Sequence, residues 1–404
     1  MGSSDQQLQD ICQLIVDCPH SSAKDEGAGY PLIRTPNVGR GRLILNGVQR
    51  VSRSVYLERV SRAVPRQGDL ILAREAPAGN VAIIDSDYPV CLGQRTMLLR
   101  PDNNLVNPYF LVYYLNAPEQ RARLLRLSNG ATVPHVNVAD VRAFPVHLPT
   151  RARQDRIASV IKPIDDILTL HACTNGYLYE CCTAKMIDIV SSSDRTMTVG
   201  ECCESIYSGG TPSTKKAAYW NGNLPWLSSG ETRCRFIIDT EKTITELGVA
   251  ESSTKLAKAG DVVMASAGQG FTRGQTSMLF FDTYVNQSVV VMRPKRDYGA
   301  YLLLMLAAQY DNLRAWSDST STRGSMSGKL LRQFELPYFD VEQAKELTAF
   351  TAPMFAMIEN NMRESKALAQ TRDALLPKLM SGEIDVSEVE LPKQLNSHLC
   401  DCLR

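Results

Sequence analysis

The sequence predicts an α+β fold in which two mixed α/β domains are separated by two long, antiparallel coiled-coil helices. Two observations lead to this fold class. A shift of roughly 190 residues brings the two halves of the chain into register, and each half closes with a long stretch of helical periodicity. Gly68-Asp69 then corresponds to Gly260-Asp261, and Arg100-Pro101 to Arg293-Pro294. The chain of 404 residues is therefore predicted to be a pseudo-twofold tandem repeat.

Each copy begins with about 145 residues of mixed pattern. Short apolar runs at 69–73, 80–84 and 288–292 lie between Gly and Pro residues and predict strands. The segments 109–115 and 301–306 predict short helices.

Long helices are predicted at about 153–190 and 341–381. Some 35 helical residues extend about 50 Å, a length suited to holding two domains apart. Pro163 and Pro353 lie at equivalent positions and predict a shared kink or break, with two shorter helices joined at each proline as the alternative. In the second helix the spacing predicts a coiled-coil seam at Leu347, Phe350, Met354, Met357, Asn361, Leu368 and Leu375.

Composition excludes several classes of protein. The 44 basic and 43 acidic residues leave a net charge of +1, which excludes a uniformly basic nucleic-acid binder. A hydrophobic content of 44% with 22% charged residues is typical of a globular protein. No apolar run approaches the ~20 residues that span a bilayer, and the first residues lack the pattern of a signal peptide. We therefore expect a cytoplasmic protein.

The eleven cysteines include no C-x-x-C pair. Cys181-Cys182 and Cys202-Cys203 are adjacent and point in different directions, which disfavours a zinc site. His398, Cys400 and Cys402 near the end are three potential ligands, but we expect no metal there. Reduced, mostly buried thiols are predicted.

The five histidines form no H-E-x-x-H or comparable motif. Asn107-Pro108-Tyr109-Phe110 is similar to the N-P-P-Y/F tetrad of adenine methyltransferases but lacks the second proline, and its counterpart Gly299-Ala300-Tyr301-Leu302 lacks Asn and Pro. An extended cap before a short packing helix is the favoured interpretation. We expect no active site and no cofactor bound by this chain.

Arginine is concentrated in the first copy. Residues 34–74 contain nine arginines, no lysine and only two acidic residues, Glu58 and Asp69, so the net charge of this segment is +7. The guanidinium fork matches phosphate oxygens and guanine edges, which favours nucleic-acid binding over a merely solvated charged face.

A Gly-rich loop, 208–216, occupies part of the second copy and ends in Lys215-Lys216. Its small hydroxyl residues, backbone amides and lysines suit phosphate contacts, while Arg233, Arg235, Gln269 and Arg273 are candidates for reading base edges. Trp220 and Trp226 are predicted to pack in the core.

Three segments carry a family resemblance. Ser208-Gly-Gly-Thr-Pro-Ser with Tyr219-Trp220 and Leu224-Pro225-Trp226 resembles the start of a target-recognition domain in the specificity (S) subunits of type I restriction-modification enzymes. Residues 130–137 with Phe144-Pro145-Val146 resemble the exit from such a domain, and 375–384 the end of the second helix. The resemblance covers about residues 5–388, although the first copy has no match for Ser208 to Ser213.

The resemblance implies a non-catalytic DNA-recognition subunit. Each target-recognition domain would read one half of a bipartite, asymmetric site, and the helices would set the spacer and dock methyltransferase subunits. Two methyltransferase subunits are expected, with a restriction subunit optional. S-adenosylmethionine, ATP and Mg would be bound by these partners. The implied boundaries are 1–150 and 192–338 for the domains, 151–191 and 339–384 for the helices, and 385–404 for a tail.

Predicted DNA contacts come from both copies. In the first they are Arg34, Asn37, Arg40, Arg42 and Arg74, and in the second Thr211, Ser213, Lys215, Lys216, Arg233, Gln269, Arg273 and Arg323. The alternatives are a stand-alone protein that binds bipartite DNA sites, a coiled-coil scaffold without DNA, and an adenine methyltransferase acting alone, which would need a cofactor loop and a complete tetrad.

Overall fold

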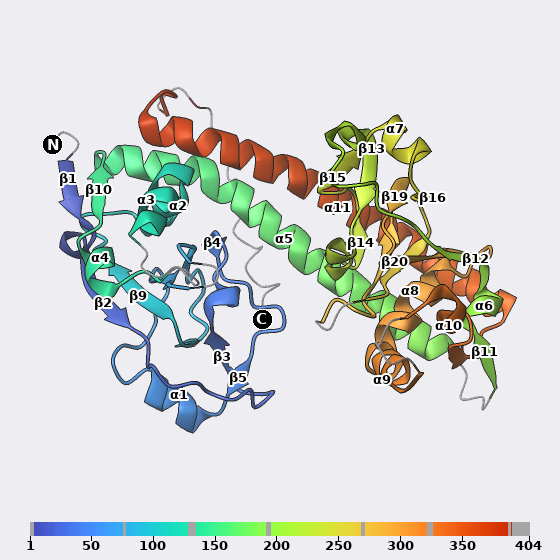
Figure 1. Cartoon of the computed structure of the whole chain (residues 1–404). Helices are drawn as coiled ribbons and strands as arrows, with labels where there is room; N and C mark the ends of the chain where they lie inside the picture. Colours follow the sequence, from blue (N-terminus) through green and yellow to red (C-terminus); the bar gives the residue numbers. More distant parts are fainter. Residues whose placement is uncertain are drawn as a thin grey trace. The chain divides into compact units, whose positions relative to one another are not determined.

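A computed structural model describes residues 4–75, 78–127, 135–190, 195–267, 271–320, 326–386 and 389. The chain divides into two compact units, shown with their labelled elements in Figure 1. Unit 1 comprises Met1–Thr169 with Ala367–Arg404, and unit 2 comprises Leu170–Lys366. Each unit therefore contains one mixed domain and parts of both long helices.

Unit 1 is built on a five-stranded sheet in the order β2-β9-β6-β7-β4, beside a three-stranded sheet, β5-β3-β8, and a two-stranded ribbon, β1-β10. Its elements before the long helix are β1 (Ser4–Gln7), η1 (Leu8–Asp10), β2 (Cys12–Asp17), β3 (Tyr30–Ile33), η2 (Thr35–Asn37), β4 (Gly41–Arg42), β5 (Arg50–Val51), α1 (Arg53–Arg59), β6 (Leu70–Ala73), β7 (Val81–Ile83), β8 (Cys91–Leu92), β9 (Thr96–Pro101), α2 (Pro108–Asn116), α3 (Pro118–Arg126), α4 (Val138–Arg142) and β10 (Pro145–Leu148).

Unit 2 repeats this plan with the sheet order β12-β20-β17-β18-β14, a four-stranded sheet, β15-β13-β19-β16, and a ribbon, β11-β21. Its elements between the long helices are β11 (Thr196–Thr198), α6 (Val199–Cys202), β12 (Cys203–Ser208), η3 (Ala217–Tyr219), β13 (Trp220–Leu227), η4 (Ser229–Arg233), β14 (Phe236–Ile237), β15 (Lys242–Ile244), α7 (Glu246–Ala250), β16 (Lys255–Ala257), β17 (Val262–Ala265), β18 (Thr276–Leu279), β19 (Thr283–Val285), β20 (Val289–Pro294), α8 (Gly299–Ala308), α9 (Tyr310–Thr320), α10 (Gly328–Leu331) and β21 (Glu335–Pro337).

The predicted tandem repeat is confirmed strand by strand. β4 pairs parallel with β7, as β14 does with β18, while the other pairs of each large sheet are antiparallel. Even an irregularity is shared, because the ladder shifts register between Cys12 and Leu14 and again between Cys203 and Ser205. The sequence-predicted strands at 69–73, 80–84 and 288–292 correspond to β6, β7 and β20.

Alternate residues of the central strands enter two different cores, because successive side chains of a strand point to opposite faces. In unit 2, Val262 and Met264 pack with helix α8 and the long helices, whereas Val263 packs with Val285 and other residues of the smaller sheet. Unit 1 divides its large sheet in the same way. Each large sheet is thus buried on both faces, which explains why its central strands are continuous apolar runs.

The long helices are α5 (Arg151–Ile189) and α11 (Val341–Ser381). Within each unit their segments run antiparallel: Asp165 lies opposite Arg372 in unit 1, and Asn175 opposite Asn361 in unit 2. Both helices continue through Pro163 and Pro353. The predicted break at each proline and the alternative of two shorter helices are therefore wrong, while a kink stays a prediction.

The predicted seam of α11 needs one correction. Met357 is 49% exposed, whereas the neighbouring Phe355 and Ile358 are 7% and 1% exposed. The reason is that α11 packs on the mixed domain as well as on α5, so its buried stripe is wider than a two-helix seam. Leu347 is fully buried, as predicted.

Candidate nucleic-acid interface

The arginines of segment 34–74 fall into two sets, those with exposed side chains and those whose guanidinium groups are bonded inside unit 1. Arg40, Arg53 and Arg66 are exposed. Arg59 is only 4% exposed and donates to two backbone carbonyl oxygens, one of them that of Leu92 at 2.8 Å. The net charge of +7 therefore overstates the charge that this segment presents to a ligand.

Arg74 lies inside unit 1, where it is 6% exposed. Its Nε donates to the carbonyl oxygen of Val136 at 2.9 Å, its Nη1 forms an ion pair with Asp17 at 2.6 Å, and its Nη2 lies 2.6 Å from Nε2 of His135. These contacts connect β2 to the segment before α4. They argue against the predicted role of Arg74 as a DNA contact.

Asn37 shapes the turn that precedes β4. It is 6% exposed, its Oδ1 accepts from the backbone N–H of Arg34 at 3.1 Å, and its Nδ2 donates to the carbonyl oxygen of Ile44 at 3.0 Å. Arg34 itself is half-buried, whereas Arg40 at the far end of the turn is exposed. Asn37 therefore holds the backbone of Arg34 and Ile44 together, and a direct contact of its own with DNA stays a prediction.

Arg42 is held by two carboxylates. It forms an ion pair with Asp85 at 2.5 Å and another with Asp166 of helix α5, and its side chain is 18% exposed. Burial lowers the pKa of Arg42, but the carboxylates of Asp85 and Asp166 more than offset this effect, so its pKa is raised overall. The predicted contact of Arg42 with DNA would require breaking both pairs.

The Gly-rich loop of unit 2 is shaped by close backbone approaches. A Cβ atom on Gly209 would lie 1.9 Å from the carbonyl oxygen of Val285, and one on Gly210 would lie 2.2 Å from Oγ of Ser253. The Gly210 N–H donates to that same Val285 oxygen at 3.0 Å. The two glycines are therefore required by packing.

Residues after these glycines differ in exposure. Thr211 is half-buried and donates through its hydroxyl to Gln287, while Ser213 and Lys215 are exposed. Lys216 donates to Tyr219 Oη at 2.6 Å. It also forms an ion pair at 3.2 Å with Glu251, the residue that follows α7. Hydrogen bonds from Tyr219 and Lys216 lower the pKa of Glu251.

The two tryptophans support this loop. Trp226 is 4% exposed and donates to the carbonyl oxygen of Gly210 at 3.3 Å. Trp220 is half-buried, meets Trp226 edge to face at 5.0 Å between ring centroids, and donates to the carbonyl oxygen of Ser213 at 3.2 Å. The prediction that both pack in the core is confirmed for Trp226, and Trp220 covers the edge of the same cluster.

The remaining predicted residues of unit 2 are spread over several positions. Arg233 is exposed at the end of η4, whereas Arg273 is 6% exposed and forms an ion pair with Asp318 at 2.7 Å. Arg235 donates to Thr276 through one nitrogen, at 2.8 and 3.0 Å. Gln269 and Arg323 lie outside the described residues, as does most of the 130–137 motif.

The sequence-based interpretation missed Phe271. This side chain is 86% exposed, and its carbonyl oxygen accepts from Tyr310 Oη at 2.6 Å. A phenylalanine in the polar, Gly-rich stretch 268–274 was the available signal, since such a ring has no strand or helix pattern to join. An exposed aromatic ring on a tethered loop suits stacking against a base.

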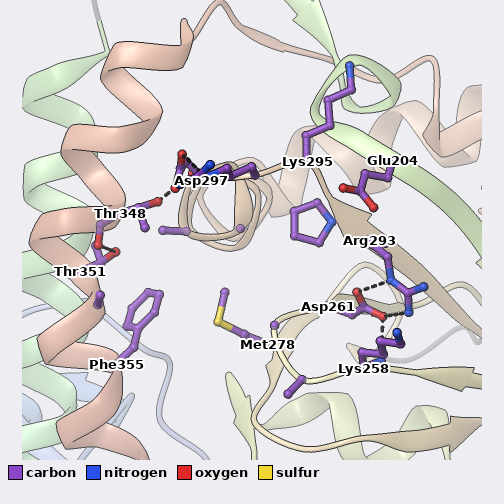
Figure 2. Close-up of a pocket in the computed structure, with 17 residues that line it drawn as sticks. Glu204, Lys258, Asp261, Met278, Arg293, Lys295, Asp297, Thr348, Thr351 and Phe355 are labelled. Carbon is purple, nitrogen blue, oxygen red and sulfur yellow. Dashed lines mark hydrogen bonds and ion pairs between the residues drawn. The ribbon is translucent and has the colours of Figure 1, made fainter.

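A cavity of about 440 Å³ in unit 2 lies between α8, α11 and the large sheet (Figure 2). Met278 and Phe355 line its apolar part, and Lys258 and Lys295 are among its charged residues. Figure 2 shows Asp261 bonded to Arg293, at 3.0 and 2.8 Å. Its lining, all within the described part of the chain, includes neither His nor Cys, so it contains no thiol or imidazole nucleophile.

The favoured interpretation of the Asn-Pro-Tyr-Phe segment is confirmed. Asn107 is the N-cap of α2: its Oδ1 accepts from the backbone N–H groups of Tyr109 and Phe110 at 2.8 and 3.2 Å, and Pro108 occupies the first turn. Among the described residues, no group of His, Cys, Asp or Glu is arranged to hold a metal ion. None of the described helices is long and apolar enough to cross a membrane.

A family model described as the type I restriction modification DNA specificity domain matches residues 3–175 and 194–359. The chain is 22% identical over 375 residues to the type I restriction enzyme MjaIX specificity subunit of Methanocaldococcus jannaschii, spanning 86% of this chain and 84% of that one. It is 19% identical to the HindI specificity subunit of Haemophilus influenzae, over 79% and 87% of the two chains. The crystal structure of a type I S subunit from M. genitalium shares the fold, with a TM-score of 0.56, 14% identity, and coverage of 94% and 96%.

Proposed function

This chain belongs to the type I restriction modification DNA specificity family, and from that premise we propose how it reads DNA for the other subunits of its complex. It is a non-catalytic specificity subunit. Each unit would read one half of a bipartite, asymmetric site. The antiparallel helices α5 and α11 would fix the unread spacer and dock methyltransferase subunits.

One observation carries this proposal: the two units repeat one sheet topology but present different exposed residues on their loops. Unit 1 presents Arg40 beyond a buried turn, whereas unit 2 presents Lys215, Arg233 and Phe271. A common scaffold with different surface chemistry is what two unlike half-sites require, because base edges are distinguished by donors, acceptors and apolar contacts.

The exposed residues would divide the work of binding. Lys215 and Ser213 suit contacts to phosphates, which position the protein without reading sequence. Arg40 and Arg233 are exposed, and a guanidinium fork matches the acceptor pair of a guanine edge. Phe271 would contact a thymine methyl group in the major groove.

The partners and cofactors in this proposal follow from the family. Two methyltransferase subunits would bind S-adenosylmethionine and methylate an adenine in each half-site. A restriction subunit, where one joins, would use ATP and Mg. The complex would act in the cytoplasm, where its DNA would be found.

The decisive experiment is to sequence the host genome by a single-molecule method that detects methylated adenine, with and without this gene. Loss of one bipartite methylated motif on deletion is the expected result. A continuous motif, or an unchanged methylation pattern, contradicts the proposal.

Individual residues are tested in the purified complex through the salt dependence of DNA binding. Arg40→Ala and Lys215→Ala should each either relax the sequence preference at one half-site or reduce the slope of log K against log salt by about one. Arg296→Ala is the matched control, since its side chain is 95% exposed at the cavity of Figure 2 and is not among the proposed contacts. A variant that changes neither quantity removes that residue from the interface.

A further inference from the structure

Strand β4 of unit 1 approaches helix α5 closely. Gly41 has a φ of +103°, which favours glycine, and a Cβ atom there would lie 3.2 Å from Oδ2 of Asp165. The next residue, Arg42, pairs with Asp166 on α5 and with Asp85, which follows β7. Arg40 stands one residue before Gly41, and the ion pair of Arg42, one residue after it, attaches this turn to α5.

Asp165 and Asp166 face different partners. Asp166 also accepts from Lys162 of its own helix at 2.7 Å. Asp165 is 3% exposed and pairs with Arg372 of α11 at 2.8 Å. Of these two consecutive carboxylates of α5, Asp166 therefore pairs with β4 and Asp165 pairs with the second long helix, α11.

Unit 2 makes the same junction with aromatic rings, and beside them Asp239, two residues after β14, forms an ion pair with Lys366 of α11. Phe236 of β14 occupies the position of β4, since β14 pairs with β18 as β4 pairs with β7. Its ring stacks on Phe280 at 5.3 Å and meets Phe355 of α11 at 5.1 Å. Phe355 lies 190 residues after Asp165, the offset of the sequence repeat at the long helices.

We propose that Arg42, Asp85 and Asp166 are positioning residues whose ion pairs fix the turn that presents Arg40 on helix α5, whereas Phe236, at the equivalent position of unit 2, packs against aromatic rings instead. This inference rests on the proposed function and deepens it.

The test uses the complex with its methyltransferase subunits and measures adenine methylation on the cognate duplex and on duplexes with one base pair changed in either half. Arg42→Met and Asp166→Asn should each lower discrimination at one half-site by about tenfold, as much as the loss of one good base contact. The double variant should be no worse than Arg42→Met alone, because the two residues act as one unit. Discrimination at the other half-site and the salt slope of binding should stay as in the wild type.

Lys185→Met is the matched control. Lys185 of α5 forms an ion pair with Glu346 of α11 at 2.7 Å in unit 2. This pair joins the two long helices and does not involve β14, the counterpart of β4. This variant should leave both half-sites unchanged. A salt slope lower by about one in Arg42→Met, with equal loss on every sequence, would instead identify a phosphate contact and overturn the proposal. Additive losses in the double variant would overturn it as well.

A second measurement separates this inference from the proposed function. Amide hydrogen exchange of residues 39–44 in the full chain without DNA should be at least several times faster in Asp166→Asn than in the wild type, and unchanged in Lys185→Met. Equal exchange in all three proteins contradicts the positioning role. If the complex methylates no bipartite site but exchange still differs, the proposed function fails and the ionic attachment of β4 stands.

Discussion

Arg100 and Asp69 form a doubly bonded ion pair on the large sheet of unit 1, and Arg293 and Asp261 form its counterpart in unit 2. Nε of Arg100 lies 2.8 Å from Oδ1 of Asp69, and Nη2 lies 2.7 Å from Oδ2. The carboxylate also accepts from a backbone N–H, that of Arg66, at 2.9 Å. The same Asp–Arg pair thus lies at the start of a central strand in both units, β6 in unit 1 and β17 in unit 2.

Breaking this pair should destabilise unit 1. The Asp69 side chain is 3% exposed, so Asp69→Ala leaves the Arg100 charge partly buried without its partner, which costs about 3 kcal/mol. Urea unfolding followed by far-UV circular dichroism measures the loss in the free energy of unfolding. Lys345→Ala, which removes an ion pair whose side chains are 54% and 81% exposed, should cost less than about 1 kcal/mol. Equal effects of the two variants would contradict this prediction.

Removing the cap of α2 should have a smaller effect. Asn107→Ala deletes the oxygen that accepts from two backbone N–H groups and should cost about 1 kcal/mol of unfolding free energy. Asn107→Ser, which can also cap, should recover most of that loss, whereas Asn107→Asp should recover less, because its carboxylate would lie against that of Asp155, which accepts from Asn107 Nδ2 at 2.7 Å. Thermal unfolding of the three variants checks the order, and adenine methylation by the complex should persist in all of them. Abolished methylation in a stable Asn107→Ala protein would assign the residue a role in the reaction.

Two glycines of unit 2, one in the Gly-rich loop and one in helix α5, should respond in opposite ways to substitution by alanine. Gly209→Ala should destabilise unit 2 by at least about 1–3 kcal/mol, since its Cβ would lie 1.9 Å from a backbone oxygen. Gly176→Ala, in the interior of α5 with open space around it, should stabilise by about 0.5–1 kcal/mol. Denaturant titration of both proteins checks the signs. A neutral Gly209→Ala would mean that the loop moves freely away from β19.

Thiol reactivity should follow burial. Burial raises the pKa of Cys202 and Cys203 to about 12, so at pH 8 both are neutral thiols and react slowly. Cys181 and Cys234 are exposed and should be labelled first by maleimide. Mass spectrometry of digested protein identifies the labelled peptides, in a Cys400→Ser/Cys402→Ser background that removes the two terminal thiols. Rapid labelling of Cys202 in folded protein would contradict the packing of α6.

Much of the architecture could be predicted because the signals are local or repeated. Asp69, Arg100 and their counterparts recur at offsets near 190, and the apolar runs of β6 and β17 read directly as buried strands. The register of α11 was less predictable. Periodicity predicted burial of Met357, but the structure buries Ile358, because a third surface, the mixed domain, competes for the helix face.

The roles of individual arginines could not be predicted in this way. Arg42 pairs with Asp166, 124 residues away, and Arg74 with Asp17, 57 residues away. A guanidinium group suits a phosphate and a buried carboxylate equally well, and no local pattern distinguishes the two partners. Phe271 differs from these arginines, because its place in a polar, Gly-rich stretch was a local signal of exposure.

The tandem repeat, the long helices, the cap at Asn107 and the family all follow from the order of amino acids, because each depends on residues close in sequence or on a pattern repeated 190 residues later. Tertiary contacts alone settle which arginines are exposed, and they place Arg42 of β4 in an ion pair with α5 where Phe236 of β14 packs against aromatic rings of α5 and α11. Those contacts join residues distant in sequence, and only folding brings them within bonding distance.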